Sequence, residues 1–323
     1  MTMKDLLKSD IKKNFTGLGF WAFAICTVFL SVVFAGIDYY GITGDEDIGE
    51  TIYILYAAII CFFVVCYNVT SAISQLRDGI IKNKIISGKS RTKIFTSLQL
   101  TFLLGDMILV GISLGLDKLA VIIAGKGKKV PESVWLSSGN TIRIILAVFM
   151  LGIISTSIGL VINERFSLVI AVSLLLILTY MSSYVKNRIF NDDTLLKQKT
   201  KYEVFVDEEE NGKEYETKYS KVENPDYIGK DRLSVYKYVH HLNPVSHFRT
   251  VYDYVEINRI AEEEYKEYDI NFESLLDSDK DEAYNAKKKN LAKDYDMLPL
   301  YSIIDMMLYF GISVFVFKKK NIN

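Results

Sequence analysis

The sequence predicts an all-α polytopic membrane protein with six transmembrane helices and an α+β extracytoplasmic domain between the fifth and sixth helices. The first observation is a set of six almost uncharged stretches, each at least 20 residues long. A helix needs about 20 apolar residues to cross the hydrocarbon core of a bilayer. The stretches are 14–37, 51–76, 94–116, 144–163, 166–185 and 297–317.

The second observation is the separation of charge along the chain. Of the 323 residues, 50% are hydrophobic and 24% are charged, and the charges gather outside the six stretches. Basic residues dominate the N-terminus, the loop between the second and third stretches and the last residues, whereas 38–50 is acidic. Because an excess of Lys and Arg marks cytoplasmic loops, we expect both termini in the cytoplasm. The loop with Lys118, Lys126, Lys128 and Lys129 has the opposite bias.

Residues 1–14 precede the first apolar stretch and alternate apolar with basic positions. Met3, Leu6, Leu7 and Ile11 fall on one side of a helix, and lysines fall on the other. This pattern predicts a cytoplasmic amphipathic helix in the membrane interface. A disordered basic leader that only fixes the topology is the alternative. Residues 15–185 then hold the first five transmembrane helices.

The loop between the second and third helices, 76–93, predicts a short amphipathic helix on the cytoplasmic side. Gly88 follows its last apolar turn, where a left-handed helix cap favours a residue without a Cβ atom. Basic residues come directly after this glycine. The apolar positions have helical spacing: Leu76, Ile80, Ile81, Ile85 and Ile86.

Two carboxylates lie inside predicted transmembrane helices, Asp106 in the third and Asp305 in the sixth. A charged residue at such a depth costs at least about 2.5 kcal/mol, so it usually faces a partner or a watery cavity. One interpretation is a pair of carboxylates that line a route or bind a cationic substrate. The other is hydrogen bonding between helices. Small residues in the third helix (Gly111 and Gly115) and the fourth (Gly152, Ser155, Thr156 and Gly159) suit close helix packing.

Residues 186–296 are too polar to cross a membrane and form the predicted extracytoplasmic domain. Two alternating runs, 202–206 and 215–222, flank Asn211-Gly212, a pair typical of type I′ turns, so we predict a β-hairpin there. From Arg232 onward the spacing of apolar residues is helical. The sixth helix and a basic cytoplasmic tail occupy 297–323, and Pro299 is expected in the first turn.

Catalytic and metal-binding patterns are scarce in the sequence. Gly88-Lys89-Ser90 resembles the end of a phosphate-binding P-loop, but Asn83 stands where the first glycine of that motif is required. His240, His241 and His247 have no cysteine nearby, so structural roles are favoured over a metal site. No catalytic triad or nucleotide-binding fold is evident, and we predict that the chain is not an enzyme. A net charge of −1 gives no reason to expect nucleic acid as a partner.

The order of these parts resembles the membrane subunits of bacterial ABC transporters of the ABC-2 type. In that family the loop between the second and third helices typically has an acidic residue and glycine, then Lys-Asn-Lys, then Gly-x-Ser-Arg. The chain tends to end in phenylalanine, a basic cluster and isoleucine. The matching residues here are Asp78-Gly79, Lys82-Asn83-Lys84, Gly88, Ser90-Arg91, Phe317, Lys318-Lys319-Lys320 and Ile322.

The resemblance implies a permease of the bacterial cell membrane that works as a pair with a second permease copy or a related permease. Two separate ATPase subunits would dock beneath and bind ATP and Mg, and this chain would carry no cofactor. The coupling positions would be Asp78, Gly79, Lys84, Gly88 and Arg91. The expected function is ATP-driven export of a peptide-like or amphipathic substrate, such as a bacteriocin or antimicrobial peptide.

Two alternatives stay open at this point. One is a membrane sensor or immunity protein whose external domain binds a peptide without transport. The other is a proton- or sodium-coupled carrier that depends on Asp106 and Asp305, although the inverted repeats of many such carriers are not evident in the sequence.

Overall fold

The computed structural model describes residues 2–41, 48–124, 138–162, 164–191, 196–206, 213–223, 229–267 and 278–320. The chain divides into two compact units. One consists of Met1–Tyr180 and His241–Asn323, and we call it the helical bundle. The other is Met181–His240, and we call it the hairpin unit.

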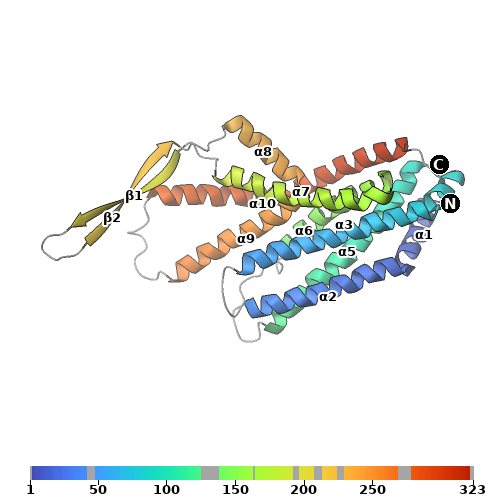
Figure 1. Cartoon of the computed structure of the whole chain (residues 1–323), viewed down its shortest axis with the longest axis horizontal. Coiled ribbons are helices and arrows are strands. Elements are labelled where there is room, and N and C mark those ends of the chain that lie inside the picture. Colours follow the sequence, from blue (N-terminus) through green and yellow to red (C-terminus); the bar gives the residue numbers. More distant parts are fainter. Residues whose placement is uncertain are drawn as a thin grey trace. The chain divides into compact units, whose positions relative to one another are not determined.

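Long helices build the bundle (Figure 1). They are α1 (Met3–Thr16), α2 (Leu18–Gly41), α3 (Ile48–Arg77), α4 (Ile80–Ile86), α5 (Arg91–Ala124), α6 (Ser138–Val161), α7 (Glu164–Asn191), α9 (Pro244–Glu267) and α10 (Ser278–Lys319). Among the described residues, five helices are long and apolar enough to cross a membrane: α3, α5, α6, α7 and α10. The pair α1 and α2, bent by 59°, makes a sixth if it counts as one span. The chain therefore has the architecture of a membrane-embedded helical protein.

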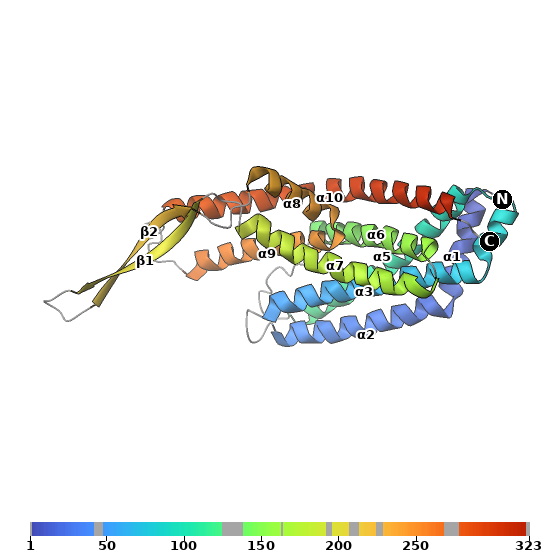
Figure 2. The same cartoon turned by 45° about the horizontal axis from the view of Figure 1, so that its top comes forward.

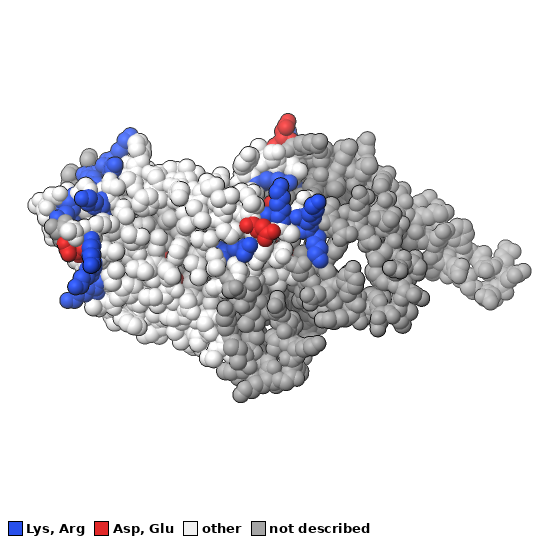
Figure 3. All heavy atoms as spheres, turned by 180° about the vertical axis from the view of Figure 1, so that it is seen from behind, with Lys and Arg blue, Asp and Glu red and all other residues white. Residues whose placement is uncertain are grey.

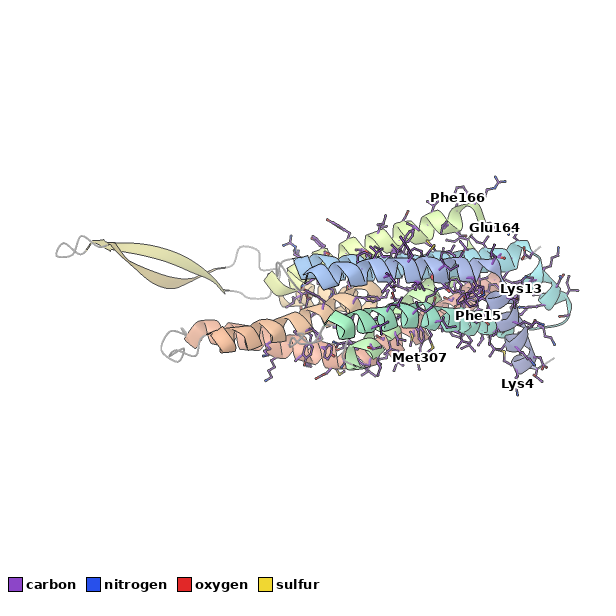
Figure 4. The ribbon with its side chains drawn as sticks, turned by 90° about the horizontal axis from the view of Figure 1, so that it is seen from below. Lys4, Lys13, Phe15, Glu164, Phe166 and Met307 are labelled. Atoms are coloured by element: carbon purple, nitrogen blue, oxygen red, sulfur yellow. The ribbon has the colours of Figure 1, made fainter. Side chains whose placement is uncertain are left out.

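Large apolar side chains cover the outside of these helices. Ile25 of α2 is 67% exposed and Met307 of α10 is 70% exposed. Met307 points away from the bundle in Figure 4. Figure 3 shows a wide band without charged side chains next to the end of the bundle that carries blue Lys and Arg. An apolar outer surface of this extent suits contact with lipid rather than water.

Small residues of α6 allow three helices to pack closely, as the sequence predicts. A Cβ atom added at Gly159 would lie 2.8 Å from the Cβ atom of Ala72 on α3. One added at Gly152 would lie 2.4 Å from a carboxylate oxygen of Asp106 on α5. Gly111 and Gly115 differ, since no described atom lies within 4 Å of a Cβ atom added at either. The packing role predicted for Gly111 and Gly115 is therefore not seen among the residues that the structure describes.

The last helix is longer than the sequence predicts, and Pro299 lies inside α10 rather than in its first turn. A proline in a helix lacks the N–H that would bond the carbonyl four residues earlier. Here that carbonyl belongs to Tyr295, and the guanidinium Nε of Arg143 on α6 donates to it at 2.9 Å. The same guanidinium lies 3.7 Å from the centre of the Tyr295 ring. A residue from another helix thus replaces the hydrogen bond that the proline cannot make.

The beginning of α9 packs inside the bundle, although the sequence analysis assigns it to a domain outside the membrane. Phe248 and Val251 are buried in the same apolar cluster as residues of α3 and α6. The Asn243 amide donates to the carbonyl oxygen of Leu178 on α7 at 2.7 Å. The Tyr309 hydroxyl of α10 donates to the carbonyl oxygen of Leu242. Tyr309 lies ten residues before the end of α10, which is about 15 Å at 1.5 Å per residue, so the turn before α9 enters the bundle deeply.

The hairpin unit contains the end of α7 after Tyr180, two antiparallel strands, β1 (Leu196–Val206) and β2 (Lys213–Glu223), and most of α8 (Lys230–Leu242). The register pairs Leu196 with Glu223 and Val206 with Lys213. The strands include both runs from which the sequence predicts a hairpin and are longer than those runs. The predicted turn pair, Asn211 and Gly212, lies outside the described residues. The placement of this unit in an extracytoplasmic domain stays a prediction.

Candidate functional site

The candidate site is one end of the bundle, where α1 crosses beside α4, the start of α5 and the end of α10 (Figure 2). Both chain termini lie there in Figure 1, and Lys4 and Lys13 project from it in Figure 4. We call it the basic end. Its charged residues include Lys4, Lys8, Lys12, Lys13, Lys82, Lys84, Lys89, Arg91, Lys93, Lys318, Lys319 and Lys320.

The helix predicted over 76–93 is three elements in the structure: the end of α3, the seven-residue α4, and the start of α5. Glycines in the left-handed region separate them, with φ of 67° at Gly79 and 81° at Gly88. A side chain with a Cβ atom is disfavoured in that region, and there the chain reverses direction. The left-handed conformation predicted for Gly88 is confirmed, and the second glycine explains why the helix is shorter than expected.

An apolar cluster holds α4 against the bundle. Ile81 is fully buried together with Leu6 of α1, Phe95 of α5 and Phe317 of α10. The ring centres of Phe95 and Phe317 are 5.5 Å apart. Burial of one such side chain contributes about 1.5–3 kcal/mol. One side of α4 therefore packs its apolar side chains against other helices of the same chain.

Asp10 of α1 joins three helices through charged hydrogen bonds. Its side chain is 2% exposed and forms an ion pair with Lys84 of α4. The Ser97 hydroxyl of α5 also donates to it, at 2.6 Å. Lys84 is therefore engaged inside the chain rather than free for a partner. Asp10 was missed by the sequence analysis, although its place one turn after Leu6, on the apolar side of α1, is a usable signal.

Two further coupling positions also bond within the chain. The ammonium group of Lys13 on α1 donates to the Asp78 carboxylate at 3.3 Å. This hydrogen bond holds the pKa of Asp78 below its ordinary value. The guanidinium of Arg91 donates to the carbonyl oxygen of Lys318 at 2.8 Å and also to that of Lys320. These carbonyls end α10 and have no helical partner, so Arg91 acts as a C-terminal cap.

The exposed part of this region is small and mixed in character. Ile86, the last residue of α4, is 74% exposed, although Ile81, little more than one turn earlier, is fully buried. We define the α4 surface by five of the exposed residues: Lys82, Asn83, Ile86, Ser87 and Lys93. It combines one large apolar side chain with basic and amide groups, a composition that suits a groove on another protein.

The intramembrane carboxylates have separate environments. Asp106 is 0% exposed, and the Asn68 amide nitrogen of α3 lies 3.0 Å from both of its oxygens. Asp305 is 6% exposed, and one of its oxygens has no hydrogen-bond partner in the described chain. No hydrogen bond or ion pair of the described residues joins the two. A hydrogen bond thus joins Asp106 to a neighbouring helix, and the two interpretations of this residue stay open. The sequence analysis missed its partner, Asn68, which is an isolated amide in an apolar run.

His247 has a structural place at the start of α9. Its Nδ1 lies 2.9 Å from the Ser302 hydroxyl oxygen, and its Nε2 lies 2.7 Å from the carbonyl oxygen of His241. Both ring nitrogens are thus engaged within the protein. Within the described ranges, no group of three or more His, Cys, Asp or Glu side chains is placed to hold a metal ion.

Compared with models of known protein families and with curated proteins, the chain matches none. The geometry of the basic end and the sequence pattern therefore carry the functional argument.

Proposed function

We propose that this chain is the membrane-spanning permease subunit of an ATP-driven ABC transporter, with the α4 surface as the docking site for a separate ATPase subunit. The observation that supports it most is Ile86, a large apolar side chain that is 74% exposed at the polar end of a membrane bundle. An exposed apolar residue among basic groups is typical of an interface that a partner covers.

The internal bonds of the basic end support the same proposal. A docking element that transmits force needs to be rigid, because a loose loop would absorb the motion of its partner. The α4 helix is fixed to α1 by Asp10 and Lys84, while Arg91 connects the adjoining start of α5 to the end of α10. A push on α4 thus acts on helices that cross the membrane. In this view Asp78, Lys84 and Arg91 position the α4 surface, and its exposed residues touch the ATPase.

We further propose that the basic end faces the cytoplasm of a bacterial cell and that the hairpin unit is part of an extracytoplasmic domain. Basic residues favour the cytoplasmic side of a membrane. The substrate is proposed to be peptide-like or amphipathic and exported. ATP and Mg would bind the ATPase subunit and not this chain.

A second permease copy is the proposed membrane partner. In the most apolar parts of α7 and α10 only 22% of residues are buried, against 56% to 61% in those of α3, α5 and α6. These two helices therefore offer apolar faces to lipid or to another membrane helix.

The test is co-purification of the chain with its cognate ATPase from native membranes, followed by measurement of ATP turnover. Ile86→Glu is expected to abolish co-purification and the stimulation of ATP turnover, because it buries a charge in the proposed interface. Ser9→Glu, an exposed change on α1 at the same end of the bundle, is the matched control and is expected to change neither. Normal binding and turnover with Ile86→Glu would overturn the docking assignment.

A transport assay separates this function from a sensor or immunity protein. The complex in liposomes is expected to move a labelled amphipathic peptide across the membrane only when ATP is supplied. Peptide binding without ATP-dependent movement would favour the sensor.

A further inference from the structure

A row of buried polar side chains runs through the interior of the bundle, between α3, α5 and α6. We call it the polar column and define it by Asn68 and Gln75 of α3, Gln99 and Asp106 of α5, and Thr156 of α6. Each of them is at most 4% exposed. Such groups are rare in apolar interiors unless they are hydrogen bonded.

Helix geometry places these residues along one line. Asn68 and Gln75 are seven residues apart, as are Gln99 and Asp106, and residues at this spacing share one face of a helix. Thr156 follows Gly152 by one turn, and a Cβ atom added at Gly152 would lie next to the Asp106 carboxylate and 3.4 Å from the Asn68 amide nitrogen. The column thus extends from Asp106 toward the basic end over about 10 Å, since seven residues rise by 1.5 Å each.

Five polar atoms of the column have no hydrogen-bond partner among the described residues. They are Asn68 Oδ1, Gln75 Oε1, Gln99 Oε1, Gln99 Nε2 and Thr156 Oγ1. Both donors and acceptors occur in this set, as a chain of water molecules requires, because each buried water makes about three hydrogen bonds to such groups. An unsatisfied polar group in a membrane interior costs several kcal/mol, so water is the expected partner.

Asp106, at the far end of the column, has no positive partner in the described chain. Its carboxylate accepts from the amide of Asn68, and none of the ion pairs of the described residues includes it. On α3 the nearest titratable group is the Tyr67 phenol, whose oxygen accepts from Asn14. The part of α2 whose side chains are described, from Leu18 to Phe34, has no charged residue, and Arg143 of α6 bonds at the other end of that helix. The membrane-capable segment of α10, Lys288–Lys319, carries charged residues in its first turns, Asp305 farther on and basic residues at its end. Those of the first turns are Lys288, Lys289, Lys293, Asp294 and Asp296.

We propose that Asp106 is a proton-binding site and that the polar column conducts protons to it from the basic end through bound water. A carboxyl group without a counter-charge is stable in such an interior as the neutral acid, because ionisation there costs at least about 2.5 kcal/mol. Proton release through the column creates a charge between α3, α5 and α6, where Gly152 leaves no room for the helices to close further. The site gives the transmembrane helices a pH-sensitive element, whether or not an ATPase docks at the basic end.

Infrared spectroscopy of the purified full chain in lipid nanodiscs tests the proton site. At neutral pH the spectrum is expected to contain the carbonyl band of a protonated carboxylic acid, and the band is expected to shift on transfer to D2O. Asp106→Asn is expected to remove it and Asp305→Asn to leave it. A spectrum in which Asp106→Asn changes nothing in this region would overturn the proposal. Asp106→Asn is a buried change that risks misfolding, so a second measurement leaves Asp106 in place. Carbon-13-labelled aspartate is incorporated into the chain that carries Asp305→Asn, and a shift of the acid band with this label is expected and assigns the band to an aspartate other than Asp305.

The rate of the D2O shift tests the route. The double variant Gln99→Leu, Thr156→Val keeps the shapes of the side chains and removes three of the five unpaired atoms, and it is expected to slow the shift severalfold. Gly111→Ala on the open side of α5 is the control and is expected to leave the rate unchanged. An acid band that shifts equally fast in the double variant would overturn the column as the route.

Discussion

At the basic end the buried carboxylate Asp10 has partners on two other helices, whereas the polar column contains five polar atoms without a partner in the described chain. Both regions place polar groups where water is scarce. The first is closed by its own side chains and is built to be rigid. The polar column has donor and acceptor atoms without a hydrogen-bond partner in the described chain, and such atoms can bind a small polar molecule such as water. In the proposals made above, the basic end is the mechanical element and the polar column is the binding element of the same bundle.

The largest effect is expected from Asp10→Ala. It leaves the ammonium group of Lys84 with its side chain only 13% exposed and without its carboxylate, and removal of one member of such a pair costs about 3 kcal/mol. Thermal unfolding in detergent, followed by loss of helical circular dichroism, measures the change. Lys8→Gln, an exposed change on the same helix, is the control. If the double variant Asp10→Leu, Lys84→Met is no more stable than Asp10→Ala, an unpaired Lys84 is not the cause of the lost stability.

The next effect concerns the glycine beside the polar column. Gly152→Ala places a Cβ atom 2.4 Å from the Asp106 carboxylate, so either this buried side chain or α6 has to shift. Overpacking of this kind costs about 1–3 kcal/mol. Gly111→Ala, which meets no atom within 4 Å, is expected to be neutral or slightly stabilising. Equal melting temperatures of the two variants would show that the column is not tightly packed.

A smaller effect is expected from Arg91→Gln. The variant loses the charged hydrogen bonds to the carbonyls of Lys318 and Lys320, which are together worth about 1–2 kcal/mol. Hydrogen–deuterium exchange is expected to rise in the last turn of α10 and to stay unchanged in α6. Arg77→Gln is the control, because the Arg77 side chain is 70% exposed. Unchanged exchange at the end of α10 would argue against the cap.

The smallest effect is the pH dependence of the exposed pair of Lys13 and Asp78. Because the pKa of Asp78 is lowered in the folded chain, its contribution to stability is complete above the ordinary aspartate pKa of about 3.9. It is lost as the pH falls through the lowered value. Lys13→Met is expected to remove this slight acid sensitivity, measured as the difference in melting temperature between neutral and strongly acidic buffer. An unchanged acid response in that variant would assign the sensitivity to other carboxylates.

The sequence predicts the parts of this protein that depend on local pattern. Long apolar runs identify the membrane-capable helices, and the position of Gly88 identifies a left-handed cap. The sequence predicts α10 too short because Pro299 is a local signal for a helix start. The group that lets the helix continue through this proline, Arg143, lies on another helix.

The candidate site depends more on distant pairs. Lys84 and Asp10 are 74 positions apart, and Arg91 bonds to Lys318, which follows it by 227 positions. No local spacing encodes such contacts. The sequence therefore identifies the residues of the loop. The structure shows which of them bond to other helices and which are exposed.

The most direct test is the accessibility of two single cysteines, Ser87→Cys on the α4 surface and Lys293→Cys near the other end of the bundle, in a chain without its native cysteines. A membrane-impermeant thiol reagent is added to intact cells and to inverted vesicles. The account predicts that Lys293→Cys reacts only in intact cells and Ser87→Cys only in inverted vesicles. Reaction of both cysteines from the same side would contradict a bundle that crosses the membrane with its basic end inside.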